Sequence, residues 1–91
     1  MNVNYLFELY ESGYRNFAGL HLCNADLQQR ILVDIDLQQA SLIRANLSRV
    51  FMTKATLSDA NLHRVNASYA KLSEANLHRA QLDKADLRGS F

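Results

Sequence analysis

Residues 40–64 read ASLIR-ANLSR-VFMTK-ATLSD-ANLHR when they are divided into units of five. A large apolar residue stands third in each of these units, and apolar residues continue at this spacing without an insertion over fifteen positions. These positions are Phe17, Leu22, Leu27, Leu32, Leu37, Leu42, Leu47, Met52, Leu57, Leu62, Ala67, Leu72, Leu77, Leu82 and Leu87. A period this strict indicates a repeat architecture.

A small residue precedes most of these positions by two: Ala25, Ala40, Ala45, Ala55, Ala60, Ala70, Ala75, Ala80 and Ala85. A spacing of two puts both side chains on one face of an extended segment, with the residue between them pointing outward. A long amphipathic helix is unfavourable, because five helical residues advance about 500° and the apolar positions would spread around the axis. Each unit is therefore predicted to be a short extended side with a two-residue corner, and the units wind into an all-β solenoid.

Charged corner residues indicate how many sides close one coil, because equivalent residues of neighbouring coils lie about 4.8 Å apart. With four sides, Asp34, Lys54 and Glu74 form a column of alternating charge. Three sides would instead stack three arginines. A coil of four sides is favoured, although exposed pairs contribute only about 0.2 to 1 kcal/mol.

With these units, residues 15–91 resemble the pentapeptide-repeat family. The resemblance implies a right-handed quadrilateral β-helix, here of nearly four coils. In the first units the small position holds the bulky residues Arg15, Leu20, Arg30 and Ile35. We interpret this as a widened first coil that meets a cap.

Residues 1–14 are predicted to be an N-terminal capping helix and linker, in one domain with the β-helix of residues 15–91. Apolar residues recur at helical spacing over residues 3–12, Asn2 is a candidate N-cap, and Gly13 suits the left-handed position after a helix. The helix covers the open end of the first coil, and Arg15 or Arg30 is expected to reach the carbonyls at its C-terminus.

The other end of the array stops at Phe91 with no helix after it. Three interpretations remain open: Phe91 forms a lid, the end pairs with another copy as a homodimer, or the chain is part of a longer one. Phe91 is therefore a candidate self-association residue.

Composition narrows the possible partners and the compartment. The formal net charge is +1, so neither nucleic acid nor an anionic membrane is strongly favoured. Cys23 is the one cysteine, which excludes an internal disulfide and fits a reducing compartment. Residues 1–12 lack a basic segment of the signal-peptide kind and no apolar run is long enough to span a bilayer, so a cytoplasmic location is expected.

No set of residues indicates a reaction, a metal or a cofactor. His21, His63 and His78 fall on different sides or coils, and Cys23 lies two coils from His63, too far for a catalytic pair. The column Asp26, Asn46, Asn66 and Asp86 is interpreted as a hydrogen-bonded ladder along the stack. Because a filled solenoid also has no pocket, we expect a protein that is not an enzyme.

Nucleic-acid binding and mimicry of DNA are weaker alternatives. Arg44, Arg64 and Lys84 form a basic column, but acidic residues interrupt the surface around it. Some members of the pentapeptide-repeat family, which this chain resembles, mimic DNA and inhibit a type II topoisomerase. That mimicry requires a strongly negative surface. Residues 15–91 hold all ten Lys and Arg but only seven of the nine Asp and Glu, since Glu8 and Glu11 precede them.

Three apolar residues, Ile31, Val33 and Phe51, fall at outward positions on one side of the first two coils. Adjacent exposed apolar residues mark either a surface covered by the cap or its linker, or a surface that binds a partner. The resulting expectation is an interaction scaffold that binds another protein, with self-association as the alternative.

Overall fold

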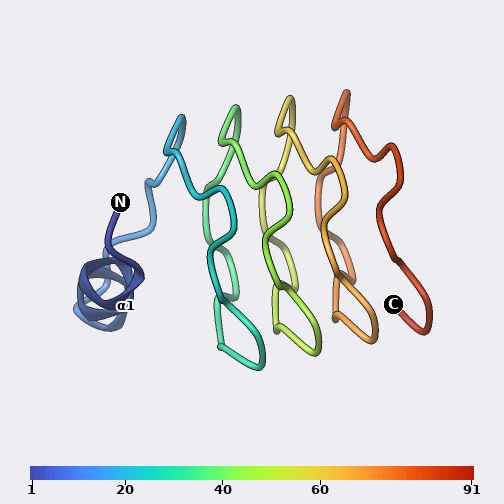
Figure 1. Cartoon of the computed structure of the whole chain (residues 1–91). Helices are drawn as coiled ribbons and strands as arrows, with labels where there is room; N and C mark the ends of the chain where they lie inside the picture. The colour runs from blue at the N-terminus through green and yellow to red at the C-terminus, as the bar shows by residue number, and fades with distance from the viewer.

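The computed structural model describes all residues, 1–91, as one short helix followed by a tower of coils. Helix α1 (Val3–Glu11) lies at one end of the tower, and the chain then winds away from it to the C-terminus at the other end (Figure 1). The molecule measures 32 × 21 × 21 Å along its principal axes. No helix is both long and apolar enough to cross a membrane.

Each coil contains 20 residues, because every bridge between coils joins a residue to the one 20 positions later in parallel. Ile31 pairs with Phe51 and Phe51 with Lys71, and the same offset holds on the other sides. Four units of five residues therefore close one coil. The alternative of three sides is excluded, since it would require an offset of 15.

On each side of a coil, a single outward residue forms the bridge to the next coil. No strand of two or more residues is present. At a typical bridge the Asn46 N–H donates to the carbonyl of Ala25, and the Leu47 N–H donates to the carbonyl of Asn66 in the following coil. Backbone hydrogen bonds thus run in both directions along the tower. They hold the coils at the spacing of a parallel sheet, although each side is too short for a strand.

The corners are tight turns with a left-handed residue at their second position. Thirteen residues other than glycine have φ between 57° and 64° at this position, together with Gly19 and Gly89. The backbone closes across the corner, as where the Ala60 N–H donates to the Leu57 carbonyl. Positive φ at the third residue of such a four-residue turn is the feature of type II turns.

Outward Asn and Asp side chains stabilise these corners from within the same coil. The Asn46 Oδ1 accepts the Ser48 N–H at 3.0 Å, and the Asp26 Oδ1 accepts the Gln28 N–H at 3.2 Å. The same contact occurs at Asn16, Asp36, Asn61, Asn66, Asn76 and Asp86. The predicted ladder between coils is therefore wrong: the column exists, but its side chains cap their own turns as Asx turns.

The core is a continuous stack of the large and small inward residues. The apolar residues from Phe17 to Leu62 at the five-residue spacing are all buried, as are the alanines between Ala40 and Ala70 at the small position. Val65 is buried in the unit where Ala67 replaces leucine, and Val50 is buried in the unit of Met52. These pairs conserve the volume of the side, which a close-packed interior tolerates best.

Helix α1 lies over the first coil. Asn2 is its N-cap, with Oδ1 accepting the Asn4 N–H at 2.8 Å, and Gly13 has φ of 103° just beyond the C-terminal end. Leu6 and Phe7 are buried against the tower. The helical surface therefore continues the core where the coils begin.

Two arginines at the small position of the first coil connect the tower to α1. Arg15 Nη1 donates to the Tyr10 carbonyl at 2.7 Å, and its guanidinium carbon lies 3.7 Å from the centre of the Tyr10 ring. Arg30 does not reach a carbonyl of α1; its guanidinium carbon lies 3.8 Å from the centre of the Phe7 ring. Of the two candidates, Arg15 makes the predicted contact.

The last coil is less enclosed than the others. Leu72, Leu77 and Leu82 are partly buried, and Leu87 is 39% exposed. Phe91 is 71% exposed, and its backbone N–H donates to the Ala70 carbonyl in the regular coil pattern. Phe91 is thus the next outward residue of its column and does not form a lid over the inward leucines.

Candidate interaction surface

The four sides of the tower carry different outward residues. Three sides present mostly Asn, Asp and hydroxyl residues; these columns are Asn16, Asp36, Thr56, Asn76; then His21, Ser41, Asn61, Gln81; then Asp26, Asn46, Asn66, Asp86. The fourth column is Ile31, Phe51, Lys71 and Phe91, which we call the Ile31 side. Apolar residues at outward positions are concentrated on this one side.

The three apolar residues singled out in the sequence have different environments. Ile31 is 65% exposed and stacks directly below Phe51 in the next coil, where Phe51 is half-buried. Val33 is also half-buried, and its carbonyl accepts a hydrogen bond from the Tyr10 hydroxyl at 2.8 Å. The cap therefore contacts the corner at Val33 but leaves the side chain of Ile31 open to solvent.

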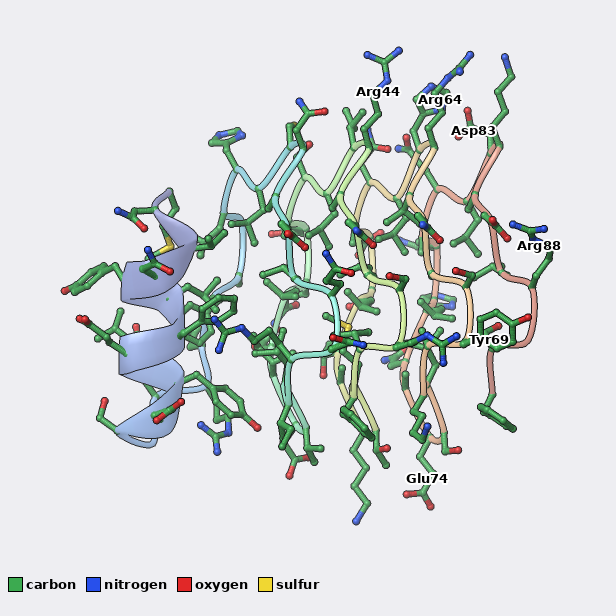
Figure 2. All side chains as sticks on the ribbon, turned by 60° about the horizontal axis from the view of Figure 1, so that its bottom comes forward. Arg44, Arg64, Tyr69, Glu74, Asp83 and Arg88 are labelled. Atoms are coloured by element: carbon green, nitrogen blue, oxygen red, sulfur yellow. The ribbon has the colours of Figure 1, made fainter.

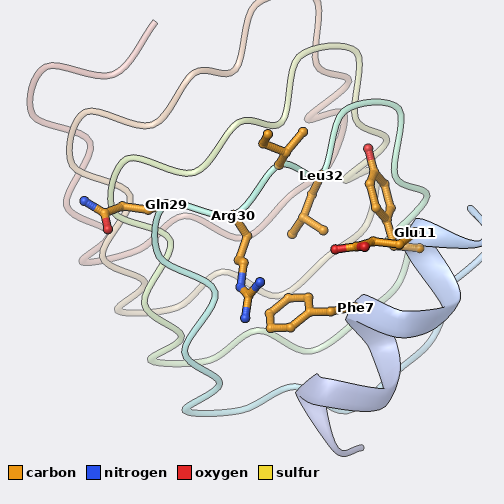
Figure 3. Close-up of a pocket in the computed structure, with 7 residues that line it drawn as sticks. Phe7, Glu11, Gln29, Arg30 and Leu32 are labelled. Carbon is orange, nitrogen blue, oxygen red and sulfur yellow. The ribbon is translucent and has the colours of Figure 1, made fainter.

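A hollow separates α1 from the Ile31 side. It has a volume of about 380 Å³ and is lined by Phe7, Tyr10, Glu11, Gln29, Arg30, Ile31 and Leu32. Figure 3 shows the Arg30 guanidinium stacked beside the Phe7 ring, with Glu11 on the helix across the hollow. We call it the cap-end hollow.

A second hollow lies farther along the tower. It is lined by Gln29, Arg49, Phe51, Tyr69, Lys71 and Phe91 and has a volume of about 360 Å³. We call it the cation–aromatic groove. Lys71 Nζ lies 4.9 Å from the centre of the Phe51 ring and 5.7 Å from that of Phe91, while the Arg49 guanidinium carbon lies 4.9 Å from the Tyr69 ring centre.

Sequence reasoning missed Arg49, Tyr69 and Lys71 as parts of this surface. The signal was present, because a coil of 20 residues puts Phe51, Lys71 and Phe91 in one column and Arg49 beside Tyr69 in the adjacent one. Apolar residues at outward positions were the only ones considered, and the cations beside them were therefore not included. The predicted patch is therefore one end of a larger mixed surface.

The charged residues elsewhere form local pairs without a pocket. His63 Nδ1 is hydrogen-bonded to Asp83 Oδ2 one coil away, and Arg64 Nε donates to His63 Nε2 at 3.3 Å. Figure 2 shows Arg44, Arg64 and Asp83 together along one edge of the tower, with Glu74 on the opposite edge. None of these residues lines the cap-end hollow or the cation–aromatic groove.

One carboxylate has a perturbed pKa. The side-chain hydrogen bonds from Arg88, followed by the Arg88 backbone N–H, lower the pKa of Asp86 below its ordinary value. The same pair raises the pKa of Arg88. Because both groups lie at the surface beside a corner, the shift reflects the Asx turn with its added ion pair and does not indicate a catalytic acid.

Metal-binding chemistry has no assembled donor set here, since no three His, Cys, Asp or Glu side chains lie together. Cys23 is exposed, and its Sγ lies 3.2 Å from the Ser41 hydroxyl. His21 and His78 form no hydrogen bond through their rings. The histidines and the cysteine are thus separate surface residues.

Comparison with protein families matches the repeat model "Pentapeptide repeats", in eight copies, to residues 21–59 and 60–91. The chain belongs to the pentapeptide-repeat family. A search of curated proteins gave no match.

Solved structures of cyanobacterial pentapeptide-repeat proteins are closely similar. HetL, involved in heterocyst differentiation regulation in Nostoc sp. strain PCC 7120, superposes with a TM-score of 0.97 at 34% identity. That match covers 99% of this chain and 38% of HetL, so the chain spans less than half of the length of HetL. A second Nostoc PCC 7120 protein has a TM-score of 0.96 at 35% identity, over 98% of this chain and 74% of its own. Rfr23 of Cyanothece 51142 has a TM-score of 0.69 at 32% identity, over 82% and 58% respectively.

Proposed function

We propose that the chain is a right-handed quadrilateral β-helix that works as a non-enzymatic scaffold in the cytoplasm and binds another protein on its Ile31 side. The observation that carries the proposal is the asymmetry between the four sides. Asx turns cap corners on the other three sides, whereas no residue of the Ile31 side makes this contact.

The outward residues of the Ile31 side do not stabilise the corners, as Asn and Asp do at the same position on the other three sides. An Asn or Asp at this register gains a hydrogen bond to the turn, worth about 0.5 to 1.5 kcal/mol. Ile31 forgoes that bond and keeps 65% of its surface exposed. A protein that gives up local stability for exposed apolar surface commonly uses that surface in recognition.

The rigid arrangement of this side supports the same proposal. Backbone hydrogen bonds fix Ile31, Phe51 and Lys71 at the spacing of adjacent coils. A partner that fits the side meets a preformed surface and orders little of it on binding. The similarity to HetL, which is involved in the regulation of heterocyst differentiation, supports a role for this scaffold in regulation.

The test is recovery of a partner by the variant Ile31→Asn with Phe51→Asn. Asparagine is the residue that the neighbouring sides use at this register, so the new Oδ1 is expected to accept the N–H two residues later. The gained bond and the lost burial of a half-buried Phe nearly cancel, and stability should stay within about 1 kcal/mol of the parent. Proteins captured from the source lysate by the parent chain should be lost from the variant.

The matched control is Thr56→Asn with Gln81→Asn, which introduces asparagine at outward positions of two other sides without removing apolar surface from the Ile31 side. It should retain the captured proteins. Equal recovery by the parent, the variant and the control, with urea unfolding showing all three folded, would remove the Ile31 side as the binding surface.

A second candidate is association of two copies through the coil of residues 72–91. The N–H groups of Leu77, Leu82 and Leu87 have no acceptor, whereas the equivalent group of Leu57 donates to the Asn76 carbonyl of the next coil. The partly buried Leu77 and Leu82 and the exposed Leu87 beside this open edge favour pairing with another edge. In sedimentation of the 91-residue chain, the fraction of dimer should then rise with protein concentration. A monomer at every concentration up to about 1 mM would count against this candidate.

A further inference from the structure

We propose that the cation–aromatic groove binds an acidic peptide segment in extended conformation, with a carboxylate facing Arg49 and Lys71. This proposal rests on the proposed function and names the chemistry of the partner. It follows from the charges in the groove, the position of its rings and its continuity with the exposed Ile31.

The side chains that line the groove carry two positive charges and no negative one. Arg49 and Lys71 are its charged lining residues, and neither forms an ion pair with a carboxylate of this chain. Arg88, by contrast, is neutralised by Asp86 at 2.8 Å. An incoming carboxylate would meet two cations at once, which is the complementarity that fixes the register of a binding partner.

The aromatic rings hold these cations in place. Lys71 Nζ stands over the Phe51 ring and near Phe91, and the Arg49 guanidinium stands over Tyr69. A cation held over a ring loses less side-chain freedom when it then binds an anion.

The absence of a side chain at Gly89 leaves room for the Tyr69 ring. A Cβ on Gly89 would lie 2.5 Å from two carbons of that ring, and the φ of 67° at Gly89 adds backbone strain for any other residue. Tyr69 therefore rests on the bare backbone of the next coil and forms a wall of the groove. Gly89 acts as a positioning residue for Tyr69 and Arg49.

The length of the surface suits an extended segment along the tower axis. The groove and the cap-end hollow share Gln29, and the column from Ile31 to Phe91 crosses three coil spacings. At about 4.8 Å per coil this distance is about 14 Å, which an extended peptide covers with about four or five residues. An apolar side chain of the peptide would then lie on Ile31 while the carboxylate lies at Lys71.

Single-stranded nucleic acid is the less favoured occupant. Such ligands need free aromatic faces on which bases stack, and several cations that follow the phosphates. Here Lys71 lies over Phe51, Arg49 lies over Tyr69, and Gly89 lies against the same Tyr69 ring. The ring faces are therefore covered and not open for bases to stack on.

The experiment measures fluorescence anisotropy of labelled peptides of about ten residues, which alternate Leu with Glu, Gln or Lys. The Glu–Leu peptide should bind about tenfold more tightly than the Gln–Leu peptide, the Lys–Leu peptide should not bind, and the preference should weaken as salt rises. No binding of the Glu–Leu peptide at about 1 mM, or tighter binding of an oligothymidylate of about ten nucleotides, would overturn the proposal.

The variant Arg49→Gln with Lys71→Gln should remove the preference for Glu over Gln peptides. Glutamine already occupies the same registers at Gln29 and Gln81, so the fold should tolerate both changes. The matched control, Lys54→Gln with Arg79→Gln, removes the same charge from other corners and should leave the preference intact. Gly89→Ala should weaken binding of the Glu–Leu peptide several-fold by displacing Tyr69.

The outcomes separate this proposal from the proposed function. Equal binding of Glu–Leu and Gln–Leu peptides, abolished by Ile31→Asn with Phe51→Asn, would leave the Ile31 side as a protein-binding surface and overturn the acidic preference. Loss of the preference in the Lys54 and Arg79 control as well would also overturn it, since net charge alone would then explain the binding.

Discussion

At the scale of the residue, the second corner position is the most constrained feature of this chain. Thirteen side-chain-bearing residues adopt positive φ there, a conformation that costs an L-residue about 1 to 2 kcal/mol relative to right-handed φ. No Val, Ile or Thr occurs at any of these positions, although Val33, Ile43 and Thr53 occur one position earlier. That exclusion was the sequence signal for the turn type, since β-branched residues are the least tolerant of left-handed backbone.

Arg79→Gly is therefore expected to stabilise the protein. Arg79 has φ of 61°, is exposed and forms no ion pair, so glycine removes strain without removing a contact. The free energy of unfolding in urea should rise by about 1 kcal/mol. His78→Gly, one position earlier where φ is not positive, should lower it by about 0.5 to 1 kcal/mol, and an equal gain at both positions would contradict this account of the corner.

At the scale of the element, α1 is held to the tower by side chains that replace small residues of the repeat. Arg15 donates a charge-assisted hydrogen bond to the Tyr10 carbonyl and also stacks on the Tyr10 ring. Arg30 only stacks on the Phe7 ring. The sequence predicted the helix, its N-cap and its glycine, because these depend on neighbouring residues. Which arginine reached the carbonyl depended on how α1 lies across the coil.

Arg15→Ala should loosen α1 more than Arg30→Ala. Loss of a charge-assisted hydrogen bond and a cation–π contact should cost about 2 to 4 kcal/mol, compared with about 0.5 to 1 kcal/mol for the stack alone. Hydrogen exchange of the amides in Val3–Glu11 measures the difference directly. Equal protection in the two variants would show that the Arg15 hydrogen bond does not hold the helix.

At the scale of the whole molecule, enclosure varies along the tower. Leu47 has coils on both sides and is buried, whereas Leu82 in the last coil is only partly buried. Each coil contacts only its neighbours, so stability is close to a sum of coil terms and interface terms. The end coil lacks one interface.

Leu47→Ala should therefore cost about 2 to 5 kcal/mol through an enclosed cavity. Leu82→Ala should cost roughly 1 kcal/mol, because solvent already reaches that side chain. Urea unfolding of the two variants checks the difference. Similar costs would mean that the last coil is covered in solution, as the second candidate function requires.

The sequence by itself determined the inward pair of each unit, the outward remainder and the helical cap, and the charge column of Asp34, Lys54 and Glu74 favoured a coil of four sides. Each of these features depends on residues at most one coil apart. The tertiary structure alone decided that the Lys71 amine lies over the Phe51 ring, that the Arg49 guanidinium covers Tyr69, and that Gly89 makes room for the Tyr69 ring. The leucine spacing looks the same at every multiple of five, so it cannot specify how outward side chains lean across neighbouring coils. That arrangement depends on positive φ at the corners and on packing between residues 20 apart.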